Sequence, residues 1–376
     1  MSEKIARFLA EAQPETPCLV VDLEVIARNY RALAAALPLA RIYYAIKANP
    51  ARQVLGVLRD LGASFDAASI YEIEDCLALG IAPSRLSFGS TIKKERHVAA
   101  AFARGVRLFA FDSARELDKL ARAAPGARVF CRIFMEGAGA DWPLSKKFGC
   151  DVAMARDLLI EARRRGLEPY GLSFHVGSQQ RDLGQWDIAL GRSAMVFSAL
   201  REAGIELRMI NLGGGFPAHY RQDVPTSAAY GAAIAAALTK HFGNSLPQTI
   251  VEPGRGIAGD AGIIQAEVVL ISKKSYGDER RWVYLDIGRF GGLIETMDEA
   301  IKYRIRTPRD GGPEGPVVLA GPTCDEVDVL YDKANYRMPL DLEVGDRIEI
   351  LAAGAYTTTY CSVAFNGYPP LKEYYI

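Results

Sequence analysis

Eight short apolar runs alternate with helix-patterned segments along the first two thirds of this 376-residue chain. Apolar residues recur at helical spacing in the segments 51–61, 70–79, 115–123 and 152–165. The apolar runs end near Lys47, Asp66, Gly89, Asp112, Arg132, His175, Asn211 and Glu252. Strands that alternate with helices form parallel sheets, and eight such units close a (β/α)8 TIM-like barrel. An open doubly wound sheet is the alternative, but a closed ring gathers side chains that follow many different strands.

The pattern changes beyond about residue 260 to β-branched and aromatic runs separated by Gly/Pro turns. We predict strands at 263–271, 281–286, 316–320, 347–352 and 355–364. The N-terminal stretch predicts a short surface helix. The chain is therefore predicted to form an α/β barrel over 23–260 and an all-β barrel or sandwich domain from 1–22 and 261–376.

The composition limits the class of partner. Lys plus Arg (45) balance Asp plus Glu (45), so no net field would attract nucleic acid or an anionic membrane. The uncharged run 350–371 is rich in Thr, Tyr, Asn, Gly and Pro, which does not suit a membrane span. The six cysteines form no CxxC pair, and Cys18, Cys131 and Cys361 lie in apolar or strand-like stretches. We expect a cytoplasmic protein with a small-molecule or protein partner and no metal site.

Lys47 and Asp66 follow the first two predicted barrel strands. A lysine at a strand end usually lies on the surface. At a desolvated barrel mouth its neutral amine is favoured, and it can form a Schiff base with a carbonyl. Asp66 is open to two interpretations: it caps the helix that begins near Ser69, or it faces Lys47 across the mouth.

Further polar and glycine-rich positions follow the last three predicted barrel strands. A core location is the default for His175, but Gly177 and Ser178 after it favour a role toward a ligand. Glycines 213–215 follow strand seven, where barrels bind phosphate through backbone N–H groups. Arg255 suits a phosphate, and the carboxylate of Glu252 can keep a pyridine nitrogen protonated. These features indicate an aldehyde cofactor that carries a phosphate and a ring nitrogen.

Two segments of the predicted β domain also contain residues with chemical potential. The segment 321–328 is first of all a turn after a strand, but in it a thiol, Cys324, is followed at once by an acid, Asp325. The reactivity of such a thiol depends on the local charge. The segment 354–357 is consistent with a simple strand that has Tyr356 as an aromatic anchor.

Together these segments resemble the fold type III pyridoxal-phosphate decarboxylases, most closely the ornithine/lysine decarboxylase branch. The resemblance runs from roughly Thr16 to the C-terminus. The motifs that carry it stand in one unbroken order: YAIKAN (44–49), FDAAS (65–69), SFHVGS (173–178), GGGFP (213–217), EPGR (252–255), GPTCDEVD (321–328), GAYT (354–357) and FNGY (365–368). Each motif alone is weak, whereas the eight in order are specific.

The resemblance implies that pyridoxal 5'-phosphate is the cofactor. Lys47 would bind its aldehyde, with Asp66 close to the amine. His175 would stack on the ring, and Glu252 would keep the ring nitrogen protonated. The phosphate would be surrounded by Ser178, Gly213, Gly214, Gly215, Arg255 and Tyr356.

The resemblance also implies a substrate and an assembly. Cys324 would come from the partner subunit of a head-to-tail homodimer and protonate Cα after carbon dioxide leaves. The β domain would thus contribute to the dimer interface and to the active site. Asp325 and Asp298 would pair with the distal ammonium of a diamino acid. The implied reaction is decarboxylation of L-ornithine to putrescine in polyamine biosynthesis, with L-lysine to cadaverine as a second activity. One departure is Pro143, which stands where eukaryotic ornithine decarboxylases have an arginine.

Several alternatives stay open. Diaminopimelate decarboxylase has a substrate with a distal carboxylate, and Glu follows its thiol where this chain has Asp325. A racemase of the same fold needs a tyrosine base. A catalytically inactive regulator would bind another protein, but the retained Lys47, Cys324 and Asp325 argue against it. Ornithine is preferred because two acids can meet its shorter chain, although one methylene is worth only about 1 to 3 kcal/mol. Arginine is disfavoured because the family's arginine enzymes are typically much longer.

Overall fold

The computed structural model describes residues 1–142 and 147–376 of the chain. These residues fall into two compact units. The β unit comprises Met1–Ile26, Ala218–Asp223 and Arg255–Ile376, and the barrel unit comprises Ala27–Pro217 and Val224–Gly254. Among the described residues, no helix combines the length and the apolar character that are needed to cross a membrane.

Within the described part of the barrel unit, eight parallel strands close into a barrel, as predicted. In chain order they are β2 (Ala40–Ala45), β3 (Ser64–Ala67), β4 (Leu86–Phe88), β5 (Leu108–Phe111), β6 (Arg128–Arg132), β8 (Glu168–Ser173), β10 (Met209–Asn211) and β11 (Gln248–Val251). The ring closes where β11 pairs with β2, with Thr249 opposite Ala40. The residues that end the predicted strands therefore lie together at one end of the barrel.

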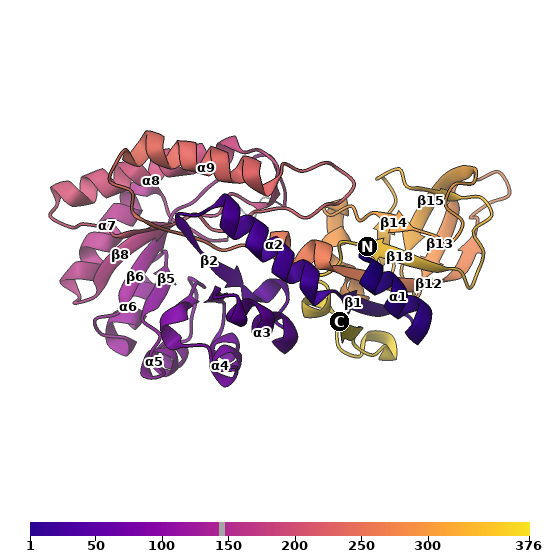
Figure 1. Cartoon of the computed structure of the whole chain (residues 1–376), viewed down its shortest axis with the longest axis horizontal. Coiled ribbons are helices and arrows are strands. Elements are labelled where there is room, and N and C mark those ends of the chain that lie inside the picture. Colours follow the sequence, from indigo (N-terminus) through magenta and orange to yellow (C-terminus); the bar gives the residue numbers. More distant parts are fainter. Residues whose placement is uncertain (143–146) are drawn as a thin grey trace. The chain divides into compact units, whose positions relative to one another are not determined.

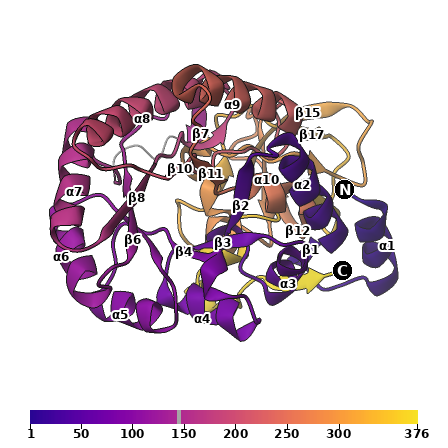
Figure 2. The ribbon, with the colours of Figure 1, turned by 60° about the vertical axis from the view of Figure 1, so that its left-hand side comes forward.

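Helices surround this ring of strands (Figure 2). They are α2 (Leu23–Ala36), α3 (Arg52–Asp60), α4 (Ile70–Ala78), α5 (Glu95–Ala103), α6 (Ala114–Ala123), α7 (Val152–Arg164), α8 (Gly184–Glu202) and α9 (Ser227–Phe242). The four helices predicted by residue range are confirmed as α3, α4, α6 and α7. Several begin at a side-chain cap: Ser69, Ser113, Asp151 and Thr226 each accept a backbone N–H of the first turn. Two short strands outside the ring, β7 (Ala140–Trp142) and β9 (Ser178–Gln180), pair with each other.

Buried side chains from several strands meet in the interior of the barrel. One cluster of buried side chains contains Tyr43, Ala110, Phe130, Tyr170, Met209 and Ile250. These residues come from six different strands, so their side chains can meet only inside the ring. Barrels of parallel strands bind their ligands at the end where the strands terminate, and the predicted site residues follow the strands at that end.

The β unit contains a nine-stranded sheet within the described residues. Its central path runs β14 (Ile305–Arg306), β18 (Arg347–Leu351), β12 (Gly262–Ser272), β13 (Arg281–Leu285), β15 (Glu314–Ala320) and β16 (Val329–Tyr331). Beside this path, β17 (Arg337–Pro339) pairs with β15, and β1 (Cys18–Val21) pairs with both β12 and β19 (Lys372–Tyr375). In Figure 1 the strands from β12 onward are orange to yellow, whereas β1 is indigo. The all-β class predicted for this part of the chain is confirmed.

Four of the five strands predicted in this unit are present, and the fifth is wrong. The segment 355–364 forms turns and the short 3-10 helix η6 (Thr358–Tyr360). Backbone φ is +58° at Tyr356, and Thr357 Oγ1 donates a hydrogen bond to the Ala353 carbonyl at 2.8 Å. Left-handed backbone and a threonine that bonds its own chain both disrupt a strand, despite the β-branched composition. Cys361 consequently lies outside any strand and is half-buried.

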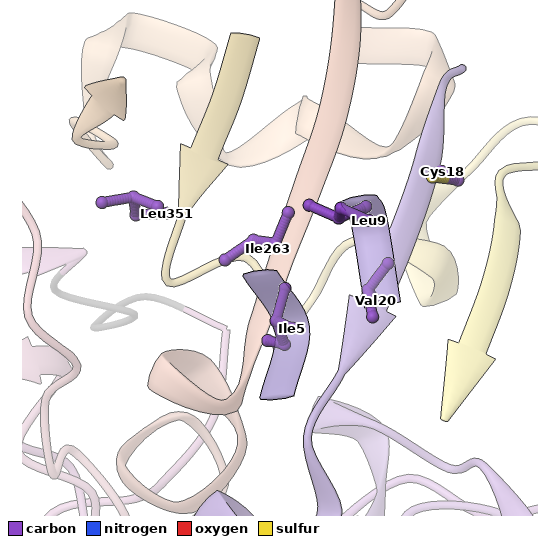
Figure 3. Packing of buried hydrophobic residues seen from close by; sticks show 6 residues of the cluster. All are labelled: Ile5, Leu9, Cys18, Val20, Ile263 and Leu351. Carbon is purple, nitrogen blue, oxygen red and sulfur yellow. The ribbon is translucent and has the colours of Figure 1, made fainter. Parts of the chain in front are cut away.

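The predicted N-terminal helix is α1 (Glu3–Ala12), which begins at Ser2, whose hydroxyl accepts the Ile5 N–H at 3.3 Å. Its buried face consists of Ile5 and Leu9. These two side chains pack against Cys18 and Val20 of β1, Ile263 of β12 and Leu351 of β18 (Figure 3). Ile5 and Leu9, four residues apart, lie on one face of the helix and attach it to the sheet of the β unit.

Candidate active site

Lys47 and Asp66 lie on neighbouring strands at the end of the barrel where the strands terminate. Lys47 is exposed in the 3-10 turn η1 (Ile46–Ala48) directly after β2, and Asp66 is buried in β3. Burial raises the pKa of Asp66, whereas the positive charge of Lys47 and a hydrogen bond from Ser87 lower it. The Ser87 hydroxyl donates to Asp66 Oδ1 at 2.9 Å. Ser69, and not Asp66, caps helix α4, so the interpretation in which Asp66 is the cap is wrong and its carboxylate acts electrostatically on Lys47.

Glu252 follows β11 and is held by Asn211 at the end of β10. Asn211 Nδ2 donates to Glu252 Oε1, and Asn211 Oδ1 accepts the Gly213 N–H at 2.9 Å. Burial, together with the nearby carboxylate of Asp66, raises the pKa of Glu252 to about 8, against opposing effects of Asn211, Lys47 and Arg132. A cation that bound next to this carboxyl group would favour its ionised form.

The raised pKa of Glu252 predicts a pH-dependent gain in stability for Glu252→Gln in the ligand-free protein. Between pH 4.5 and about 8 the unfolded chain has ionised this carboxyl group while the folded chain keeps its proton. The stability that Glu252 contributes is therefore complete below pH 4.5 and is lost as the pH rises through about 8. Melting temperatures of both proteins from pH 5 to 9 should show the variant gaining on the wild type with rising pH. A difference that does not change with pH would contradict the assignment.

His175 follows β8, the sixth barrel strand, and is half-buried. Its Nδ1 accepts the Gly177 N–H at 3.0 Å. Burial and the positive charges of Arg132 and Lys47 lower the pKa of His175 well below its usual value. The imidazole is consequently neutral at neutral pH, with its proton on Nε2. A neutral aromatic ring at this position can stack on a flat ligand.

The three glycines after β10 pack tightly against their neighbours. Gly213 and Gly215 have φ values of +64° and +103°. A methyl group on Gly213 would overlap the Phe174 carbonyl oxygen, and one on Gly215 would lie 2.7 Å from the Gly177 oxygen. A methyl group on Gly214 would lie 2.8 Å from the Glu252 oxygen. The glycine loop thus lies directly against the segments that follow β8 and β11. The Gly215 carbonyl also accepts the N–H of Gln180 at 2.9 Å, in the strand β9 that begins at Ser178.

Gly213→Ala is therefore expected to destabilise the protein by more than the roughly 1 to 2 kcal/mol of a left-handed alanine alone. The added methyl group has to displace the backbone of Phe174. Gly166→Ala is the matched control because Gly166 has φ of +77° and no atom within 4 Å of its ideal Cβ. Denaturant unfolding of both variants measures the difference, and equal losses would show that the glycine loop can relax.

Three neighbours of these residues were not predicted as site residues. Arg132, at the end of β6, lowers the pKa of both Glu252 and His175 through its charge. Asn211 and Ser87 hold the two carboxylates, as described above. The sequence placed Arg132 and Asn211 at strand ends, and that position was the available signal for both. Ser87 gave no signal, because it lies inside a short apolar run.

Arg255 and Tyr356, both predicted to contact phosphate, lie together in the β unit. Arg255 begins the short helix α10 (Arg255–Ala258) and is 3% exposed. Its two terminal nitrogens donate to the two Glu295 oxygens at 2.7 and 2.6 Å, and Nη1 also donates to the Tyr220 hydroxyl at 2.7 Å. The ring of Tyr356 lies 4.7 Å from the guanidinium carbon. Burial opposes the charge of Arg255, but the Glu295 carboxylate is among the groups that raise its pKa well above the usual value.

Cys324 and Asp325 lie in the loop between β15 and β16. Cys324 is exposed, and its backbone N–H donates to Asn366 Oδ1 at 2.8 Å. Asp325 is half-buried and accepts the Val327 N–H at 3.0 Å. The loop is ordered by Asp328, which is buried and accepts the Thr323 hydroxyl at 2.7 Å. A fixed loop of this kind can present a thiol and an acid outward together.

Asp298 is exposed on the segment 289–299, which follows β13. Its φ is +51°, and that of the next residue, Glu299, is +53°. No described residue donates a hydrogen bond to the Asp298 carboxylate. Consecutive left-handed residues other than glycine are uncommon, and they are often found at functional sites. The predicted departure at Pro143 lies outside the described residues.

The donor set fits a flat cofactor with an aldehyde, a ring nitrogen and a phosphate. In the barrel unit, Lys47 offers an amine, and the raised pKa of Glu252 suits a carboxyl group that meets a ring cation. The cradle formed by Gly213, Gly214 and Gly215 leaves no room for side chains. Each of these features corresponds to one part of pyridoxal 5'-phosphate.

Comparisons with known proteins agree with this donor set. Residues 23–259 match the family "Pyridoxal-dependent decarboxylase, pyridoxal binding domain". The lysine/ornithine decarboxylase of Selenomonas ruminantium is 35% identical over 98% of this chain and 91% of its own. The structure of a lysine/ornithine decarboxylase from Vibrio vulnificus with cadaverine is 31% identical, with a TM-score of 0.88, and covers 100% of this chain and 99% of its own.

A third relative corrects one prediction. The structure of the arginine decarboxylase of Paramecium bursaria Chlorella virus is 27% identical, with a TM-score of 0.90. It covers 100% of both chains, so the expectation that arginine-specific relatives are much longer is wrong as a general rule. Chain length therefore gives no argument against arginine.

The match to the family model and the matches along the whole chain establish the reaction class and the cofactor. The protein is an enzyme that uses pyridoxal 5'-phosphate to decarboxylate an amino acid. Because the closed barrel and the separate sheet unit agree with the solved structures as well, this chain belongs to the fold type III pyridoxal-dependent decarboxylases, in the branch of the ornithine and lysine enzymes.

Proposed function

We propose that this decarboxylase converts L-ornithine to putrescine and carbon dioxide in polyamine biosynthesis, and L-lysine to cadaverine as a second reaction. The observation that carries this proposal is Asp298. Its side chain is exposed, its backbone is left-handed, and no described residue donates a hydrogen bond to its carboxylate. A diamino acid brings a distal ammonium, and such a group needs an opposite charge once it leaves water. Asp325 is proposed as the second acid for that ammonium.

Each cofactor contact is assigned as part of the same proposal. When bound, pyridoxal phosphate supplies a protonated ring that accepts the electrons left on Cα as carbon dioxide departs. Lys47 holds its aldehyde end near Asp66, His175 stacks on its ring, and Glu252 keeps the proton on the ring nitrogen. The phosphate is assigned to Ser178, Gly213, Gly214, Gly215, Arg255 and Tyr356. The raised pKa of Glu252, the lowered pKa of His175 and the crowded glycine loop support these assignments.

Cys324 is proposed to finish the reaction by giving its Sγ proton to Cα. Cys324 is exposed on an ordered loop, and this position supports contact with a reacting group of another subunit. We propose that Cys324 and Asp325 act at the active site of a partner subunit in a homodimer, so that each site needs two chains. The free thiols among the described residues support a reducing cytoplasm as the location.

The substrate is tested by carbon dioxide release from L-ornithine, L-lysine, L-arginine and meso-diaminopimelate by the cofactor-loaded protein. The proposal expects the highest kcat/KM for ornithine, with lysine within about 200-fold of it, because one methylene separates the two. A higher kcat/KM for arginine or diaminopimelate would replace the proposed substrate. No release from any of the four, despite bound cofactor, would contradict the proposed function as a whole.

A further inference from the structure

A buried carboxylate that has no assigned role lies three residues before Asp298. Glu295 is 6% exposed in the β unit, and its two oxygens receive two hydrogen bonds from the Arg255 guanidinium at 2.6 and 2.7 Å. This two-point contact fixes the direction as well as the position of a carboxylate. The hydroxyl oxygen of Tyr220 accepts a further hydrogen bond from the same guanidinium at 2.7 Å. The segment that carries Asp298 is therefore attached to the start of α10 at one defined point.

The backbone between Glu295 and Ile301 closes into a compact loop around this point. The Ile301 N–H donates to the Glu295 carbonyl at 3.0 Å, and the Ala300 N–H donates to the Met297 carbonyl at 3.1 Å. Asp298 and Glu299, at the tip, have the positive φ values given above. Such backbone persists only where the surrounding structure holds it in place.

Two further contacts hold the flanks of this loop. Thr296 Oγ1 donates to the Leu293 carbonyl at 2.7 Å, and the side chain of Glu299 accepts the backbone N–H groups of Asp332 and Lys333 at 2.7 and 2.6 Å. Of the side chains named in the loop, Glu295 alone combines full burial with an ion pair to another element. Its pairing with Arg255 thus restrains the loop through a buried ion pair to another element.

We propose that Glu295 is a positioning residue for substrate selection: its ion pair with Arg255 holds the Asp298 carboxylate where a distal ammonium can reach it. The inference rests on the proposed function, because it takes Asp298 as an ammonium contact. It assigns to Arg255 a second task besides phosphate binding. The ion pair between Glu295 and Arg255 would then serve both the binding of the cofactor phosphate and the selection of substrate chain length.

The test compares binding of putrescine and n-butylamine to the holoenzyme by titration of the cofactor absorbance. These amines differ only in the distal ammonium, so the ratio of their Kd values measures recognition of that group. We expect Glu295→Gln to lower the preference for putrescine about tenfold, the lower end of what a hydrogen bond to a charged group supplies. Glu295→Asp keeps the charge but shortens the side chain, and we expect a smaller loss of about threefold. It also keeps the test informative if the glutamine variant fails to fold.

Two comparisons make the result specific. Glu343→Gln, which removes an ion pair of the same unit to Arg309 but lies largely in solvent, should leave the Kd ratio unchanged. Asp298→Asn should lower the ratio at least as much as Glu295→Gln. If Asp298→Asn lowers it and neither Glu295 variant does, the positioning role is overturned and the proposed substrate contact stands. If Asp298→Asn leaves the ratio unchanged, the ammonium contact and the inference built on it both fall, whatever the carbon dioxide assay shows.

Discussion

Lys47→Ala is expected to lower kcat/KM for carbon dioxide release by about four orders of magnitude, the upper end of what one positioned proton-transfer group supplies. The variant loses the amine that we propose to hold the aldehyde of the cofactor. A second measurement is independent of turnover. Borohydride reduction of the wild-type holoenzyme should attach the cofactor permanently to the peptide that contains Lys47, and mass spectrometry should find no such adduct in the variant.

Two matched variants separate chemistry from charge. Lys47→Arg keeps a cation beside Asp66 but offers no amine that condenses with an aldehyde, so it should be as inactive as the alanine variant. Lys94→Ala removes another exposed lysine, at the start of α5, and should retain wild-type activity. The assignment fails if Lys47→Ala keeps more than about a tenth of the wild-type rate, since general proton-transfer groups alone account for a larger loss.

Cys324→Ala is expected to reduce kcat by about 10² to 10³-fold, because a positioned acid no longer delivers a proton to Cα. The effect on KM should be small, since the proposed proton transfer follows substrate binding and loss of carbon dioxide. Steady-state kinetics with L-ornithine measures both constants. Cys361→Ala is the control, as Cys361 is half-buried in the same unit and has no proposed role.

Mixing the two inactive variants tests whether each active site is shared between chains. Random exchange of Lys47→Ala and Cys324→Ala subunits makes about half of the dimers mixed, and each mixed dimer has one site with both residues intact. We expect recovery of about a quarter of wild-type activity after subunit exchange. No recovery, although size and mass measurements show mixed dimers, would place Lys47 and Cys324 in a site formed by one chain.

The barrel could be predicted because its signals are local. Each strand is a short apolar run, and the residues at its end necessarily reach one edge of a parallel sheet, which brought Lys47, Asp66, His175 and Glu252 to the same end of the barrel. The failed strand at 355–364 has a local pattern as well, but its fold depends on the left-handed backbone at Tyr356. Composition does not reveal that conformation when the residue is not glycine or asparagine.

The contacts that tune the site could not be predicted, because they join residues far apart in the chain. Asn211 ends β10 and Glu252 directly follows the neighbouring strand β11, so their hydrogen bond depends on the register between the two strands. Arg255 and Glu295 are brought together by the packing of the β unit alone. The sequence identifies Arg255 as part of the family motif EPGR, but it gives no sign that Glu295 has a role. Pairings of this kind require the coordinates of both partners.

The strand β1 has a consequence for how the molecule is made. Residues 18–21 pair with β19, residues 372–375, and the Ile376 N–H donates to the Val21 carbonyl at 2.9 Å. On the ribosome, all residues of the barrel unit have been synthesised once residue 254 has been added, whereas β1 then still lacks its neighbours β12 and β19. We therefore expect the barrel to form during translation and the sheet of the β unit to be completed after it. Until then β1 has an unpaired edge, which makes it a natural target for chaperones.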